Sequence, residues 1–250
     1  MNAVQIQELE DLVRNVRGHV TGFYRDRWGH AETFADLPRV KREDFAATPL
    51  SKRRYKGGKS LLKFVEGERT FLSEWGLDDI AREPFGIRSS RPMSYFLNPH
   101  ETLEKAWWCY LNGMIRLTGE ANTDVTLATA EKFRIDSLIA DSASARALVP
   151  YLEKRDAPLA SISIIDSSFD PSLVQFAKYA HRVRLLLALP ETGVFGEAPL
   201  AEKLVFSPLP GCCIEEIGGH LTLSKQNLLV TPIIRYDTGI RVSEVDIVLS

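Results

Sequence analysis

The sequence contains little cysteine and no long apolar run, and both features restrict what the protein can be. Its 250 residues include three cysteines, Cys109, Cys212 and Cys213, of which two are adjacent. Adjacent cysteines rarely bridge because the bond would be strained, so we expect no disulfide framework and a reducing, cytoplasmic location. No apolar stretch approaches the roughly 20 residues that span a bilayer, and the N-terminus lacks the apolar core of a signal peptide. We therefore expect no membrane partner.

An excess of charge and clustered metal ligands are also missing. The formal net charge is −2, from 31 basic and 33 acidic residues, so no nucleic acid partner is expected. The five histidines are far apart and have none of the spacing that metal ligands require, which predicts no metal site. The sequence has no Gly-x-Ser-x-Gly turn, so a hydrolase triad would lack its nucleophile.

The pattern of apolar residues predicts an α/β fold. Strand–helix–strand repetition is typical of parallel strands joined by right-handed crossovers. After about residue 204, short β-rich pieces separated by Pro-Gly and Gly-Gly turns predict a small antiparallel sheet. We therefore expect an α/β core over residues 1–203 and a β-rich subdomain over residues 204–250. The predicted helices cover residues 4–17, 101–117, 142–154 and 171–180. The predicted strands before residue 204 lie near 61–65 and over 123–129, 159–165 and 183–189, and residues 85–98 are expected to be loop and strand.

Four stretches, taken in order, carry a family signal. GFYRDRWG (22–29) is followed by DLPRVKREDF (36–45), and LLLALPETGVFGE (185–197) is followed by TPIIRYDTGIRV (231–242). This order resembles the phenylacetate–CoA ligase branch of the adenylate-forming enzymes. The last stretch resembles the Pro-Leu-Ile-Arg-Tyr-x-Thr-Gly-Asp strand and turn of that branch. The third resembles its Tyr-Gly-x-Thr-Glu loop.

The resemblance implies a fold, an activity and a set of site residues. It implies the large N-terminal domain of a ligase that joins a carboxylate to ATP and passes the acyl group from AMP to CoA. On this basis Glu191 and Arg235 are the candidate catalytic residues. The candidate cofactor-binding residues are Ser89, Ser90 and Arg91 in the phosphate loop, and Thr192, Tyr236 and Asp237 near the nucleotide.

Several residues that this chemistry needs are replaced. Between Ser90 and Pro92 the sequence lacks the glycines and threonines that let a backbone wrap phosphates. Pro190 stands at the threonine of the Tyr-Gly-x-Thr-Glu loop, and Ile240 stands at the aspartate that accepts hydrogen bonds from the ribose. The sequence ends at Ser250, so we expect that the C-terminal lid domain is absent. These replacements argue against ATP or AMP binding.

The interpretation is therefore a truncated, degenerate ligase relative, a pseudoenzyme that binds an acyl or aryl group or a protein partner in the inherited cleft. A small carboxylate, CoA or an acyl thioester, and a carrier protein are the candidate partners, and a homodimer stays open. The alternative is an enzyme of altered chemistry. It would move an activated acyl group between thiol carriers, or work with a lid from another subunit, through Glu191, Arg235 and His220. A third hypothesis is an interaction module that uses the basic residues between Lys52 and Lys63.

Overall fold

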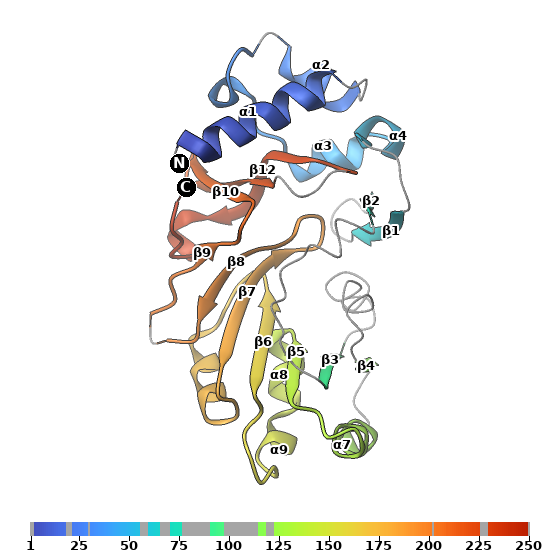
Figure 1. The fold of residues 1–250 in the computed structure, drawn as a ribbon, viewed down its shortest axis with the longest axis vertical. Coiled ribbons are helices and arrows are strands. Elements are labelled where there is room, and N and C mark those ends of the chain that lie inside the picture. The colour runs from blue at the N-terminus through green and yellow to red at the C-terminus, as the bar shows by residue number, and fades with distance from the viewer. Residues whose placement is uncertain are drawn as a thin grey trace. The chain divides into compact units, whose positions relative to one another are not determined.

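The computed structural model describes ten stretches of the chain, and these fall into two compact units (Figure 1). The first unit combines Met1–Arg82 with Ser207–Ser250, and the second comprises Glu83–Phe206. The N-terminal helices therefore group with the β-rich C-terminal segment, an arrangement that the linear division near residue 204 did not anticipate. The described stretches are residues 3–18, 22–29, 31–55, 60–65, 71–76, 91–97, 115–118, 123–201, 203–225 and 230–249.

The second unit contains the parallel sheet that the sequence predicts. Within it the strand order is β4-β3-β5-β6-β7-β8, with parallel pairing from β4 to β7 and an antiparallel β7–β8 hairpin. The strands are β3 (Pro92–Phe96), β4 (Ile115–Thr118), β5 (Ser137–Ala140), β6 (Ser161–Asp166), β7 (Val183–Leu189) and β8 (Gly193–Pro199). The helices are α7 (Thr123–Lys132), α8 (Ser142–Ala147), α9 (Val149–Leu152) and the 3-10 helix η3 (Pro171–Lys178).

The central strands of this sheet are apolar because both faces are covered. Leu185, Leu186 and Leu187 are consecutive residues of β7 and all are fully buried, the pattern typical of a parallel strand between two layers. Helix α8 packs on β3, β5 and β6 (Figure 1). The chain passes from β3 outward to β4 and then returns to β5 on the other side of β3. The strand order therefore reverses between β3 and β5.

The first unit contains the antiparallel sheet β10-β11-β12, a separate β1–β2 hairpin and short helices. None of the described helices in either unit is both long and apolar enough to cross a membrane. The strands are β1 (Ser60–Val65), β2 (Phe71–Gly76), β9 (Ser207–Pro208), β10 (Cys212–Ile217), β11 (His220–Lys225) and β12 (Ile233–Arg241). The helices are α1 (Ala3–Gly18), α2 (Gly22–Trp28), α3 (Arg42–Ala47), α4 (Leu50–Arg53), and the 3-10 turns η1 (Phe34–Asp36) and η4 (Val242–Glu244).

Three local predictions were wrong. Residues 123–129 form helix α7 instead of a strand: Val125, whose branching favoured a strand, is 58% exposed, and Ala130 is fully buried. The end of the helix predicted over 101–117 is strand β4, while residues 101–114 lie outside the described residues. Residues 231–242, expected from the resemblance to be a strand that ends in a turn at Gly239, continue as strand β12 to Arg241, with a register shift and a φ of +73° at Gly239.

Candidate functional site

Two of the family-like stretches lie side by side in the first unit. The Val40 N–H donates to the Arg235 carbonyl, and the Asp237 N–H donates to the Val40 carbonyl, both at 2.8 Å. These bonds form a parallel bridge between Val40 and Tyr236. The DLPRV segment therefore covers the edge of β12 that carries the predicted residues Arg235, Tyr236 and Asp237.

Arg235 is held at an irregular point of β12. Its φ is +48°, unusual for a residue other than glycine, and the pairing with β11 shifts register beside it. Its backbone N–H donates to the Ser224 hydroxyl oxygen at 2.9 Å. The backbone conformation directs the side chain away from a regular strand position and into the first unit, where it is only 8% exposed.

The Arg235 guanidinium binds the backbone of the N-terminal segment. Its Nη1 donates to the carbonyl oxygens of Ala35 at 2.5 Å, Leu37 at 2.6 Å and Phe34 at 3.4 Å. Its Nε lies 3.5 Å from Glu215 Oε2. Burial raises the pKa of Glu215, and the charge of Arg235 opposes that rise. This geometry gives Arg235 a structural role in joining residues 34–37 to β12, and its predicted catalytic role stays a prediction.

Tyr236 belongs to an aromatic core. It is 1% exposed, and its ring centroid lies 5.4 Å from that of Phe45 in α3. Phe45 stacks on Phe23, which meets Tyr24 edge to face. The Tyr24 hydroxyl donates to the Pro232 carbonyl oxygen, and burial raises the pKa of Tyr24. The tyrosine that the resemblance assigns to the nucleotide therefore packs helices α2 and α3 on β12.

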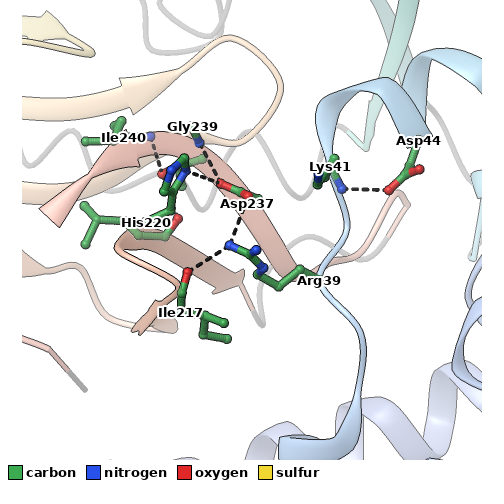
Figure 2. A network of polar contacts seen from close by, with 10 residues as sticks. Arg39, Lys41, Asp44, Ile217, His220, Asp237, Gly239 and Ile240 are labelled. Atoms are coloured by element: carbon green, nitrogen blue, oxygen red, sulfur yellow. Dashed lines mark hydrogen bonds and ion pairs between the residues drawn. The ribbon is translucent and has the colours of Figure 1, made fainter.

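Asp237 is the centre of a polar network (Figure 2). Its Oδ2 accepts a hydrogen bond from Arg39 Nη1 at 3.2 Å, and that same nitrogen donates to the Ile217 carbonyl at 2.8 Å. Its Oδ1 accepts from the Gly239 N–H at 3.0 Å and lies 3.3 Å from Nδ1 of His220. The Asp237 side chain is 11% exposed and that of His220 is 35% exposed. The network thus joins a nearly buried carboxylate to an accessible imidazole.

The resemblance places Ile240 at the position of a ribose-binding aspartate. Its side chain is 8% exposed and has no hydrogen-bond acceptor. Its N–H donates to the Thr238 hydroxyl oxygen at 3.2 Å, and that hydroxyl donates to the Leu221 carbonyl at 2.8 Å. Leaving a ribose hydroxyl unpaired in a closed site costs about 1–3 kcal/mol. At position 240 the side chain therefore offers no acceptor to a ribose hydroxyl.

The remaining predicted residues belong to the second unit. Glu191 and Thr192 form the turn of the β7–β8 hairpin and are 5% and 0% exposed. The Thr192 N–H donates to the Leu189 carbonyl at 3.2 Å. Ser89 and Ser90 lie outside the described residues. The stretch 185–197, which the resemblance likens to a loop, therefore contains the end of the predicted strand β7, a tight turn, and the strand β8, which the sequence did not reveal.

Arg91 lies at the opposite end of the parallel strands from the end expected to bind ligands. It precedes β3, and its carbonyl accepts from the Asp136 N–H, which precedes β5, at 3.2 Å. It lines an open cavity of about 540 Å³ together with Arg134, Lys154 and Asp156. Ligands of open parallel sheets usually bind at the carboxyl ends of the strands, so this position does not match a phosphate loop beyond them.

The basic segment is partly internal. Arg53 is 2% exposed, its guanidinium lies 5.6 Å from the Phe45 ring centroid, and burial lowers its pKa to about 10. Arg54 forms an ion pair with Glu74 of β2, whose side chain is 3% exposed. Two of the cations in the run from Lys52 to Lys63 therefore stabilise the first unit.

Comparisons with known proteins give similarities in fold alone. No protein-family model matches the sequence, and no curated protein matches it. An acyl-CoA synthetase from Brucella canis matches with a TM-score of 0.57 and 15% identity, over 92% of this chain and 53% of the synthetase. A long-chain-fatty-acid–CoA ligase, FadD1, from Archaeoglobus fulgidus matches with a TM-score of 0.51 and 13% identity, over 67% of this chain and 42% of the ligase.

This chain has an acyl-CoA ligase fold. The expected α/β class is confirmed, with a parallel sheet and a small antiparallel sheet. The chain spans about half the length or less of the solved ligases that it matches. At these identities the similarity establishes the architecture and leaves activity and ligand to be argued from the residues.

Proposed function

We propose that this protein is a relative of the phenylacetate–CoA ligase branch that has lost adenylation and binds an acyl or aryl group, or a protein partner. The observation that carries this proposal is the set of contacts that residues 235–240 make within the first unit. Arg235 and Tyr236 contact residues 34–37 and 45, and Asp237 is bound by Arg39. Ile240 supplies no acceptor for a ribose hydroxyl. The segment that resembles a nucleotide site is therefore occupied by internal contacts.

Isothermal titration with ATP and Mg²⁺ tests the loss of adenylation. We expect no binding at micromolar concentrations and no pyrophosphate release with phenylacetate or other carboxylic acids. The Brucella canis acyl-CoA synthetase, measured in the same buffer, is the positive control. Micromolar ATP binding together with carboxylate-dependent pyrophosphate release would show that the proposal is wrong. Titration with phenylacetyl-CoA in the absence of ATP tests the retained binding function.

Acyl transfer between thiol carriers is the second candidate, and the His220–Asp237 contact favours it. A carboxylate 3.3 Å from Nδ1 can orient an imidazole, as in many general bases. If this candidate is correct, His220→Ala abolishes thioester exchange between phenylacetyl-CoA and a second thiol, while Asp237→Asn lowers its rate. Exchange that persists at the wild-type rate in His220→Ala excludes His220 as the base. A wild-type protein with no exchange removes the candidate.

A further inference from the structure

The cavity of about 540 Å³ in the second unit lies at the amino ends of three parallel strands. The residue before each strand lines it: Arg91 before β3, Asp136 before β5 and Ala160 before β6. The Asp136 N–H donates to the Arg91 carbonyl at 3.2 Å, and the Ala160 N–H donates to the Asp136 carbonyl at 2.7 Å. Small-molecule sites usually occupy about 300–1,000 Å³, so this cavity is large enough for a metabolite.

Hydrogen bonds of Arg155 join the two walls of the cavity. One wall is the C-terminal turn of α7 with Ile135, and the other is the end of α9 with the segment that follows it. Arg155 Nη2 donates to the Ile135 carbonyl and its Nε donates to the Ala157 carbonyl, both at 3.3 Å. Its Nη1 donates to the Tyr151 hydroxyl oxygen at 2.6 Å. Both helices lie beside this end of the sheet in Figure 1, and bonds within the protein fix the shape of the cavity.

Arg134 lines the cavity from a backbone conformation that favours glycine. Helix α7 ends in a Schellman motif, in which the Ile135 N–H donates to the Ala130 carbonyl at 3.1 Å and the Arg134 N–H donates to the Glu131 carbonyl at 3.0 Å. Arg134 is the left-handed residue of this motif, with a φ of +50°. Glycine is usual there, because a Cβ costs free energy in this conformation. Since the helix end gives no reason for an arginine, the outlier points to a function of the guanidinium in the cavity.

The charges around the cavity favour a small dianion. Within the part of the chain that the structure describes, the side chains of Arg134 and Lys154 form no ion pair and no hydrogen bond. A guanidinium offers a planar fork of donors to phosphate oxygens, and an ammonium adds a point charge. A phosphate monoester carries a charge of about −1.5 to −2 at pH 7, which these two cations match. The other charged residues of the lining are the cations Arg91 and Arg155 and the carboxylates Glu131, Asp136 and Asp156, and three carboxylates disfavour a triphosphate.

We propose that this cavity binds a phosphate monoester with a small apolar body, and that Arg134 and Lys154 hold the phosphate. Exposed apolar residues of the lining, Ala157, Pro158 and Ala160, supply surface for the body. Open parallel sheets usually bind ligands at the carboxyl ends of their strands, whereas this cavity lies at the amino ends. It belongs wholly to the second unit, so it is an additional site and does not depend on the proposed function.

Matched anions test the ligand class. Calorimetric titration at about 0.15 M salt, where exposed charges are largely screened, would compare phenyl phosphate with benzoate and with inorganic phosphate. We expect phenyl phosphate to bind about tenfold more tightly than benzoate, which has the same ring and a single negative charge. Phenyl phosphate should also bind severalfold more tightly than inorganic phosphate, which has no ring to place against the apolar lining.

Arg134→Gly separates a role in binding from a role in the fold. Glycine suits the left-handed position, so the free variant should melt at a temperature at least as high as that of the wild type. Its affinity for phenyl phosphate should fall about tenfold, and Lys154→Met should weaken binding severalfold. Lys132→Met is the matched control, because Lys132 is an exposed cation in the last turn of the same helix and does not line the cavity. We expect this control to bind phenyl phosphate like the wild type.

Several results would overturn the inference. These are no binding of phenyl phosphate at millimolar concentrations, benzoate binding of equal strength, and wild-type affinity in both Arg134→Gly and Lys154→Met. An equal loss of affinity in Lys132→Met would show that the helix attracts anions without a defined site. A lower melting temperature of free Arg134→Gly would show that the guanidinium serves the fold. Inorganic phosphate that binds as tightly as phenyl phosphate would exclude an ester as the ligand.

Discussion

Replacing Arg235 by methionine should cost about 3–5 kcal/mol of the free energy of unfolding. Methionine approximates the aliphatic part of the side chain but removes donors to three carbonyl oxygens and the partner of Glu215. Breaking a buried charge pair by removing one partner typically costs 3–5 kcal/mol, because the remaining charge stays buried. Arg235 as a whole residue is 8% exposed, so solvent offers little compensation for the hydrogen bonds that are lost. Total stabilities of about 5–15 kcal/mol make this loss large.

Urea denaturation followed by circular dichroism measures the effect. The midpoint should fall strongly in Arg235→Met, and by less in Arg235→Lys, because an ammonium keeps the charge but cannot reproduce the planar fork of donors. Arg241, an exposed residue of the same strand, is the control, and Arg241→Met should change stability by less than about 0.5 kcal/mol. A loss below about 1 kcal/mol in Arg235→Met would refute the reasoning, since the three carbonyl bonds would then contribute little to the fold.

Two further substitutions in the first unit, Glu215→Gln and Gly239→Ala, have predictable effects on stability. The pKa of Glu215 is raised in the folded state, chiefly by burial, so the folded state binds the proton more tightly and loses stability as pH rises above the usual glutamate range. Glu215→Gln should lack this loss, and parallel midpoint curves for the two proteins between pH 4 and 7 would contradict the expectation. Gly239→Ala should cost about 1 kcal/mol of the free energy of unfolding in the same denaturation assay, because alanine is strained at a φ of +73°. No atom lies within 4 Å of an added Cβ, so the cost comes from the backbone conformation alone. Unchanged stability would show that the backbone relaxes.

The sequence predicts best those elements in which the pattern of apolar residues is long and unambiguous. The apolar run over 183–189 predicts β7 with its observed bounds, and the helical spacing of apolar residues over 4–17 predicts α1. Strand β5 has four residues, Ser137–Ala140, too few for a period to stand out. Residues 123–129 contain threonine and valine, whose strand preference is overridden in helix α7, where Val125 is exposed. For β5 and for residues 123–129, tertiary packing determines the secondary structure more than the local sequence does.

The candidate site could be located by sequence, but its contacts could not. The RYDTG stretch singled out Arg235, Tyr236 and Asp237. Their partners Phe34, Ala35, Leu37 and Arg39 lie about 200 residues away along the chain, and no spacing rule joins segments so distant. The DLPRV stretch also carries a family resemblance, but the sequence does not show that it pairs with RYDTG. The structure shows this pairing through the parallel bridge between Val40 and Tyr236.

Within residues 235–240, replacing Arg235 or Tyr236 has a different structural cost from replacing the residue at position 240, and this difference limits what the motif says about catalysis. Arg235 and Tyr236 are held by contacts that a substitution would break, so a chain without ligase activity still has a physical reason to contain them. The residue at position 240 has no such constraint. Burying an isoleucine there is worth about 1.5–3 kcal/mol, whereas a buried aspartate without a ligand would be destabilising. A folded protein freed from nucleotide binding is therefore expected to keep the arginine and tyrosine and to exchange the aspartate for an apolar residue. Retention of the motif is then weak support for catalysis, and Ile240 is the more informative residue.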